Sequence, residues 1–219
     1  DGVVPSCYRS PMHAHIPTIF LVIVTLSFAL ATALAMVSFG RKHGLMSWAV
    51  GMALHGAGYL LFSLRGEVSD FLSIVVANTA IATMFALFAD GIRNFAGPQP
   101  RKWFVWLPVP LIAISFTLLL DDIHARTVLS SLIYMFQGVL LAWFSYRSHT
   151  TSSGRGQYVV VAGSLLLAVV MLFRLLGALS GALSLTSITM SSPIQTLTFL
   201  MSIVSTLLVV IGVLLMTWE

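Results

Sequence analysis

Six polar side chains lie within long apolar runs of the sequence, where they are candidates for binding a ligand. They are His55, Tyr59, Asn78, Tyr134, Gln137 and Arg174. His55 and Tyr59 are one helical turn apart, as are Tyr134 and Gln137, so each pair shares a helix face. At about 1.5 Å of rise per residue, all six fall in the outer half of a membrane. Polar groups in a bilayer usually face the bundle interior, so we expect a polar cavity that opens outward.

Arg174 is the only fixed cation that this reasoning places in the cavity, and it indicates the class of ligand. A guanidinium offers a fork of donors that suits a carboxylate or a phosphate. The sequence therefore predicts a pocket for a small anionic ligand that arrives from outside. Structural alternatives stay open: buried His, Asn and Gln side chains often hydrogen-bond across helices, at about 0.6 and up to ~2 kcal/mol each. Arg174 also has Asp70 or the outer lipid headgroups as alternative partners.

A second group of residues has the chemistry of a metal site. His13 and His15 precede the first apolar run, and His124 lies in a turn beside Asp121 and Asp122. Imidazoles with nearby carboxylates can bind zinc or copper. The sequence thus allows a transition-metal site at the outer face, although interfacial histidines often have no ligand role.

Several functions are disfavoured by what the sequence lacks. No lysine lies within a predicted span, which excludes a retinal Schiff base. Neither an HExxH zinc-protease pattern nor a Gly-rich phosphate loop occurs. The net charge of +4 comes from short loops between apolar runs, so it does not indicate a nucleic-acid partner. Asp90 and Arg93 are expected to form an ion pair near the inner surface.

The elements that position these residues follow from composition. The chain is 58% hydrophobic and only 8% charged, with a mean hydropathy of +0.98, whereas about 25% of residues in soluble domains are charged. A helix needs about 20 residues to cross the hydrocarbon layer. We therefore expect an all-α, polytopic membrane protein whose partner is the lipid bilayer. The apolar runs predict seven transmembrane helices, at Ile16–Phe39, Met46–Leu64, Asp70–Ala96, Trp103–Leu120, Ala125–Tyr146, Gln157–Ser180 and Pro193–Thr217.

The membrane domain is thus expected over residues 16–219, after a tail over residues 1–15. Because Met12 is a natural start position, residues 1–11 are expected to be a cloning remnant or an upstream extension. Basic residues predict the orientation, since they collect on the cytoplasmic side. One side of a seven-span chain receives Arg41, Lys42, Arg93, Arg101, Lys102, Arg147 and Arg155. The other receives Glu67, Asp70, Asp121 and Asp122, with Arg9, Arg65 and Arg126. We expect the N-terminus outside and the C-terminus in the cytoplasm.

The first three predicted helices also carry an ordered set of residues. After "IPTIFL" come Trp48, Gly51, Gly58, the "LRG" of 64–66, Asp70, Ser73, Ile74, Asn78, the "GIR" of 91–93, Phe95 and Gly97. This order resembles the seven-span N-terminal sensory domain of bacterial GGDEF diguanylate cyclases. The resemblance implies a domain of the bacterial inner membrane that regulates cyclic di-GMP synthesis, and a homodimer, because two cyclase half-sites must join.

The 219 residues contain no GGDEF motif. The chain itself is therefore not expected to be catalytic, and the resemblance implies a C-terminal GGDEF domain as its missing partner. The main alternative is a small-solute transporter of the seven-helix SWEET-like class, built as two three-helix repeats around a linker helix. Its expected prolines in corresponding spans are not evident. A plain membrane anchor without a ligand is the third interpretation.

Overall fold

A computed structural model describes residues 16–39, 44–95, 100, 102–147, 155–181 and 193–218. Within these ranges the regular elements are helices, and the only β contact is an isolated bridge between Arg65 and Val68. The predicted all-α fold is confirmed for this part of the chain. The elements are α1 (Ile16–Ser38), α2 (Leu45–Ser63), η1 (Phe71–Val76), α3 (Ala77–Asn94), α4 (Trp103–Trp106), α5 (Pro108–Leu118), α6 (Ile123–Arg147), α7 (Gly156–Leu179) and α8 (Pro193–Trp218).

Six helical segments of the described chain are long and apolar enough to cross a membrane, as in a multi-pass membrane protein. They are Thr18–Ser38, Leu45–Ser63, Phe71–Asn94, Ile123–Arg147, Gly156–Leu179 and Ile194–Trp218. The predicted fourth helix, Trp103–Leu120, is the exception, because its apolar helical part spans only Trp103–Leu118 and is interrupted.

Two prolines explain the interruption of the fourth helix. Pro108 and Pro110 have no backbone N–H, so the carbonyls of Phe104 and Trp106 lose their helical donors. The chain therefore divides at Leu107 into α4 and α5. The sequence prediction of one continuous helix is wrong here, because it weighed apolar length and not the missing donors.

The predicted third helix, Asp70–Ala96, also begins differently. Its first turns form a π-helix, η1, and a regular α-helix starts only at Ala77. The Asn78 side chain donates its Nδ2–H to the Ile74 carbonyl at 2.7 Å, within this transition. Short π-helical segments are rare and often occur at functional sites.

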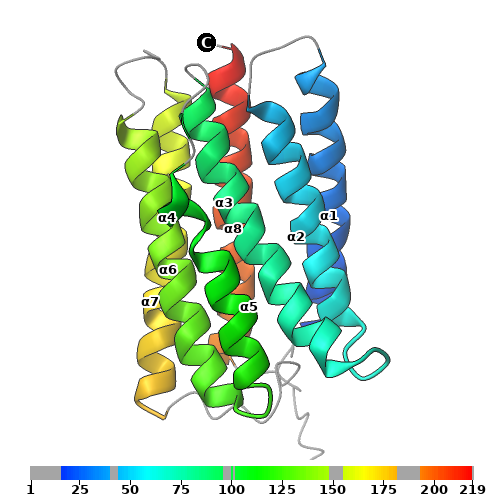
Figure 1. The fold of residues 1–219 in the computed structure, drawn as a ribbon. Helices are drawn as coiled ribbons and strands as arrows, with labels where there is room; N and C mark the ends of the chain where they lie inside the picture. The colour runs from blue at the N-terminus through cyan, green and yellow to red at the C-terminus, as the bar shows by residue number, and fades with distance from the viewer. Residues whose placement is uncertain are drawn as a thin grey trace, which may run out of the picture.

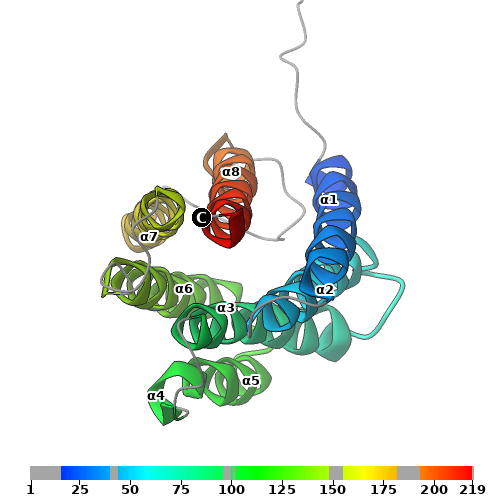
Figure 2. The same ribbon diagram turned by 90° about the horizontal axis from the view of Figure 1, so that it is seen from above.

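The long helices form a ring in chain order. Neighbours are antiparallel from α1 to α3 and from α6 to α8, whereas α3 and α6 run parallel, because α4 and α5 return the chain between them (Figure 1). Figure 2 shows α1, α2, α3, α6, α7 and α8 around the ring, with α4 and α5 outside it beside α3. Contacts are extensive within the first triple (α1, α2 and α3) and within the second triple (α6, α7 and α8), whereas α3–α6 and α1–α8 contacts are sparser. The bundle therefore consists of two triples that meet along two seams.

The two ends of the bundle differ. α1 begins at one end and α8 finishes at the other, which we name the C-terminal end (Figure 1). The end where α1 begins also carries the turns at 64–70 and 119–122, with Glu67, Asp70, Asp121 and Asp122, and we name it the acidic end. At the C-terminal end a packed core closes the ring with fully buried side chains, including Leu34, Leu45, Trp48, Met84, Leu141 and Met216.

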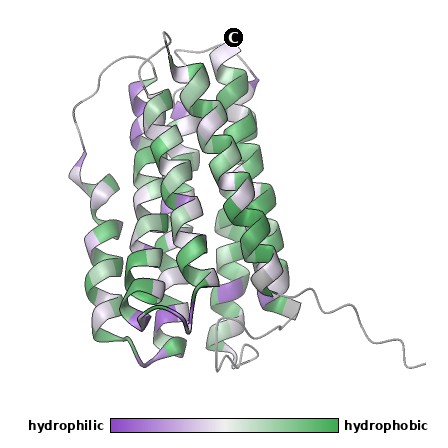
Figure 3. Cartoon of the chain, turned by 90° about the vertical axis from the view of Figure 1, so that its right-hand side faces the viewer, coloured by the Kyte–Doolittle hydropathy of each residue, from purple (hydrophilic) through white to green (hydrophobic). Residues whose placement is uncertain are grey.

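The outer surface of the ring is apolar. Large side chains such as Leu21, Phe28, Ile114, Phe136 and Phe173 are exposed along the helices. In Figure 3, hydrophobic colouring runs along the helices and hydrophilic colouring lies mostly toward their ends. A soluble monomer rarely exposes so continuous an apolar surface, whereas such a surface suits contact with lipid.

Candidate functional site

A chamber lies inside the ring, between the two triples. Its empty volume is about 560 Å³, including its mouth, and its walls come from α2, α3, α6, α7 and α8. We name it the inner chamber. Five of the six predicted ligand-binding residues line it: His55, Tyr59, Asn78, Tyr134 and Arg174. The structure thus brings together residues that are separated by as much as half of the chain.

Gln137, the sixth predicted residue, does not line this chamber. Its Nε2 donates to the Ala82 carbonyl at 2.9 Å, which links α6 to α3. Its Oε1 is buried and has no hydrogen-bond partner in the described part of the chain. Gln137 therefore acts as a structural link between the triples.

Tyr134 and Asn78 form the polar contact between the triples at the chamber wall. The Tyr134 hydroxyl lies 3.0 Å from Asn78 Oδ1 and 3.2 Å from the Asn78 carbonyl, and donates to them. Since Asn78 Nδ2 is occupied by the Ile74 carbonyl, its Oδ1 is the atom that faces α6. The amide thus ties the end of the π-helix to Tyr134.

His55 is held in one orientation by Ser27 of α1. The Ser27 hydroxyl donates to the Ile23 carbonyl at 2.6 Å, and its oxygen lies 2.8 Å from His55 Nδ1. Because the hydroxyl has a single proton, Nδ1 is the donor, and Nε2 is left with a lone pair. The ring also packs on Tyr59, with centroids 4.8 Å apart. His55 therefore offers the chamber an acceptor.

Three hydroxyls of α8 complete the inner chamber, and the sequence analysis missed them. Thr198, Ser202 and Thr206 are spaced i, i+4, i+8 and line one wall. Thr198 and Ser202 donate their protons to carbonyls one turn earlier, so their oxygens present lone pairs. Their helical period was a usable signal.

A second chamber lies beside the first, toward the acidic end. This outer chamber has an empty volume of about 390 Å³, including the open solvent at its mouth, and shares Phe62, Asn78 and Arg174 with the inner one. Arg65 and Arg126 also line it. Among the described residues, Arg174 is the one cation that lines the inner chamber, as expected, whereas the outer chamber adds two that were not predicted there. The sequence places Arg65 and Arg126 beside predicted turns, so it predicts that they lie at the outer membrane surface and not in a ligand site.

Among the described residues, the three arginines form no ion pair and no hydrogen bond to a side chain. The one ion pair there joins Arg93 to Asp90, so Arg174 is not paired with Asp70. Arg126 is only 7% exposed, and its Nη1 is buried without a hydrogen-bond partner. Burial lowers the pKa of the Arg65 guanidinium, and the Asp70 carboxylate opposes this by raising it.

The predicted metal site remains a prediction. His13 and His15 lie outside the described residues. His124 is described, and its Nε2 lies 3.0 Å from the Ala178 carbonyl, which links α6 to α7. The described ranges contain no group of three or more potential metal ligands.

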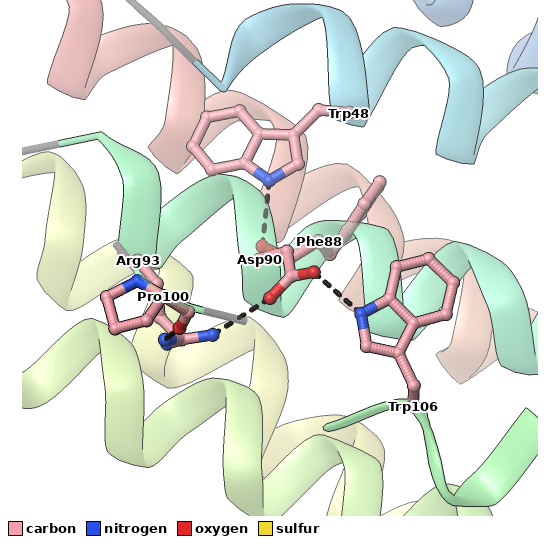
Figure 4. A network of polar contacts seen from close by, with 6 residues as sticks. All are labelled: Trp48, Phe88, Asp90, Arg93, Pro100 and Trp106. Carbon is pink, nitrogen blue, oxygen red and sulfur yellow. Dashed lines mark hydrogen bonds and ion pairs between the residues drawn. The ribbon is translucent and has the colours of Figure 1, made fainter. Parts of the chain in front are cut away.

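A separate polar network lies near the C-terminal end (Figure 4). Arg93 Nη1 donates to Asp90 Oδ1 at 2.9 Å, which confirms the expected ion pair, and its Nη2 donates to the Pro100 carbonyl. Trp106 Nε1 donates to Asp90 Oδ2 at 2.7 Å, and Trp48 Nε1 donates to the Phe88 carbonyl at 2.9 Å. The network joins α2, α3 and α4, and its buried carboxylate is satisfied.

No protein-family model, curated protein or solved structure matches the chain. The two chambers are therefore the basis on which a function is inferred. They are neighbouring chambers that share Phe62, Asn78 and Arg174, with guanidinium donors at the acidic end and aromatic and hydroxyl groups deeper in the ring.

Proposed function

We propose that this chain is the sensory membrane domain of a bacterial signalling protein, in which a small ligand binds between the two triples. The observation that carries the proposal is the inner chamber, because its walls come from both triples. A ligand there contacts α2 and α3 of one triple and α7 and α8 of the other. It shifts their relative position to the extent that it binds one arrangement more tightly than another.

We further propose that the chain crosses the membrane seven times, with α4 and α5 together as the fourth crossing. At 1.5 Å per residue, Trp103–Leu118 rises about 24 Å, which is short of the ~30 Å hydrocarbon layer. Local thinning of the bilayer accommodates such a segment at modest cost. An odd number of crossings is supported by α1 starting and α8 finishing at opposite ends of the bundle (Figure 1).

The proposed orientation has the acidic end outside and the C-terminal end in the cytoplasm of a bacterial inner membrane. It is supported by the basic residues described at the C-terminal end, which are Arg93, Lys102, Arg147 and Arg155. The chambers then receive their ligand from outside. α8 finishes at the closed end, where a cytoplasmic output domain would be joined.

The proposed output is cyclic di-GMP synthesis by a GGDEF domain that follows α8, acting as a homodimer. This part of the proposal rests on the order of residues from Trp48 to Gly97 that resembles the membrane domains of such cyclases. Its mechanism is a population shift: α8 packs closely on α7 and only sparsely on α1. Moving α8 relative to α1 therefore breaks the fewest contacts and should cost less free energy than moving it relative to α7.

The experiment fills the chamber in the full-length protein and measures its output. Ser202→Phe places a ring in the inner chamber, whereas Val204→Phe places the same ring on the exposed side of α8. We expect Ser202→Phe to change the cellular cyclic di-GMP level by about fivefold, as a shift of ~1 kcal/mol in a two-state equilibrium does. Val204→Phe should leave it unchanged. A wild-type level for Ser202→Phe at normal membrane abundance would contradict the sensory function.

A SWEET-like transporter is the second candidate, and one observation favours it. Two helix triples flank a single peripheral segment, α4–α5, with a chamber between them (Figure 2), as expected for paired three-helix repeats. The packed core at the C-terminal end supports the sensor instead, since the solute path is closed by large buried side chains. Solute uptake into vesicles that contain the purified protein would favour the transporter.

A further inference from the structure

The outer chamber contains a buried cation that forms no ion pair with any described residue. Arg126 is 7% exposed, lines the chamber, and has a buried Nη1 with no partner among the described residues. A buried charge is costly unless it is paired and hydrogen-bonded. The fold therefore holds a guanidinium at a position where a ligand anion would relieve this cost.

Two further guanidiniums border the same space. Arg65 reaches it from the turn after α2, and Arg174 reaches it from α7. The carboxylates that act electrostatically on Arg126 belong to exposed residues of the acidic end, Asp70, Asp121 and Asp122. None of these forms an ion pair with the three arginines in the described ranges. Water screens exposed charges strongly, so these acids do not replace a bound anion.

Among the described lining residues, the arginines are the charged donors of the chamber. Thr127 donates its hydroxyl proton to the Ile123 carbonyl, and Ser130 donates to the Thr127 carbonyl. Asn78 donates one of its two Nδ2 protons to the Ile74 carbonyl, so it can offer a second, uncharged N–H. The remaining walls are apolar, including Phe62 and Phe116. Low-polarity walls strengthen the attraction between a guanidinium and an anion.

We propose that the outer chamber binds an oxyanion, a phosphate or a carboxylate group, between Arg65, Arg126 and Arg174, while the rest of the ligand extends into the inner chamber. Guanidinium forks match the planar, bidentate geometry of these groups. Arg174 and Asn78 line both chambers, so a ligand that extends from one chamber to the other would pass these two side chains. The inference builds on the proposed sensory function, because it names the chemical class of its ligand.

The oxyanion has two sources, a soluble molecule or a lipid headgroup. The test measures the thermal unfolding midpoint of the purified full chain by intrinsic tryptophan fluorescence. In detergent without lipid, sodium phosphate and sodium succinate are compared with sodium chloride at equal ionic strength. In nanodiscs, phosphatidylglycerol is compared with phosphatidylcholine. We expect the midpoint to rise by about 5 °C at saturation in one arm, and that arm identifies the source.

The variants separate a binding role from a structural one. Arg126→Gln and Arg174→Gln should each weaken the response about tenfold or more in anion concentration. Arg147→Gln, at the exposed opposite end beside Trp143, should respond like the wild type. Without an anion, Arg126→Gln should not lower the midpoint, since it removes an unpaired charge.

Three results would overturn the oxyanion site. They are no response of the wild type in any arm, a response as strong as that of the wild type in both Arg126→Gln and Arg174→Gln, and a lowered midpoint of Arg126→Gln without anion. The wild-type arms need no variant, so they decide even if a variant fails to fold. The sensory function is tested separately. If Ser202→Phe changes the cyclic di-GMP level but no anion binds, the sensory function stands and the oxyanion site is wrong. If an anion binds but Ser202→Phe leaves the cyclic di-GMP level unchanged, the oxyanion site stands and the sensory function is wrong.

Discussion

The Tyr134 hydroxyl lies 3.0 Å from Asn78 Oδ1 and joins α6 to α3 at the wall of the inner chamber. Tyr134 belongs to the second triple and Asn78 to the first. Asn78 in turn holds the Ile74 carbonyl in the π-helix that also borders the outer chamber. One hydrogen bond therefore connects the seam between the triples, both chambers and the irregular start of the third membrane segment.

Replacing Tyr134 with Phe should destabilise the protein modestly. The change removes the hydroxyl and leaves Oδ1 of the half-buried Asn78 without its donor. We expect a loss of about 1 kcal/mol in the free energy of unfolding, since an orphaned polar group costs roughly 1–3 kcal/mol. Denaturant titration in mild detergent, followed by tryptophan fluorescence, measures it.

Tyr146→Phe is the matched control. Tyr146 lies on the same helix but is exposed near the C-terminal end, so the same chemical change should leave stability within about 0.5 kcal/mol. If both variants had the same stability as the wild type, the Tyr134–Asn78 bond would have no energetic role.

The gross fold was predictable because membrane helices are encoded by apolar length. The boundaries of α2 and α7, for example, fall within a residue of the predicted ones. The break at Leu107 and the π-helix before Ala77 were not predicted, because both arise from backbone hydrogen bonding. The missing N–H of Pro108 was visible in the sequence, whereas the π-helix has no comparable sequence signal.

The candidate site was predictable in part. Residues one turn apart within a span, such as His55 and Tyr59, converge because a polar face avoids lipid. Gln137 was assigned to the same chamber but bonds to Ala82, because helix rotation is determined by packing and not by depth. Arg126 was missed, because a residue at a predicted turn reads as exposed, whereas the fold buries it.

Asp90→Asn should weaken the network near the C-terminal end. Asp90 accepts hydrogen bonds from Arg93 and Trp106, and hydrogen bonds to a charged group contribute about 1.5–3 kcal/mol. Neutralising the carboxylate leaves Arg93 without its counterion, so we expect a loss of about 2 kcal/mol in the free energy of unfolding.

Asp121→Asn makes the same chemical change at an exposed site. It should shift stability by less than about 0.5 kcal/mol in the same denaturant titration. If Asp90→Asn and Asp121→Asn lowered the free energy of unfolding equally, the hydrogen bonds of Asp90 would contribute no more to stability than an exposed carboxylate does.

The proposed orientation is testable with Cys7, the one cysteine of the sequence. In intact cells, a membrane-impermeant maleimide should label Cys7, because the N-terminus is expected outside. A fluorescent protein joined after Glu219 should fold and fluoresce in the cytoplasm. Cys7→Ser is the labelling control. Labelling only after the inner membrane is permeabilised would reverse the orientation and place the chambers toward the cytoplasm.

The central claim is that an occupied chamber changes how α8 packs against α1, and a distance across that seam tests it most directly. In a Cys7→Ser background, spin labels at the exposed positions Met36 and Leu215 report the α1–α8 separation by double electron–electron resonance in nanodiscs. At the oxyanion concentration that saturates the thermal response, the distance distribution should shift by about 1–2 Å or more, and Arg174→Gln should abolish the shift. Superimposable distributions with and without the bound oxyanion would contradict the claim.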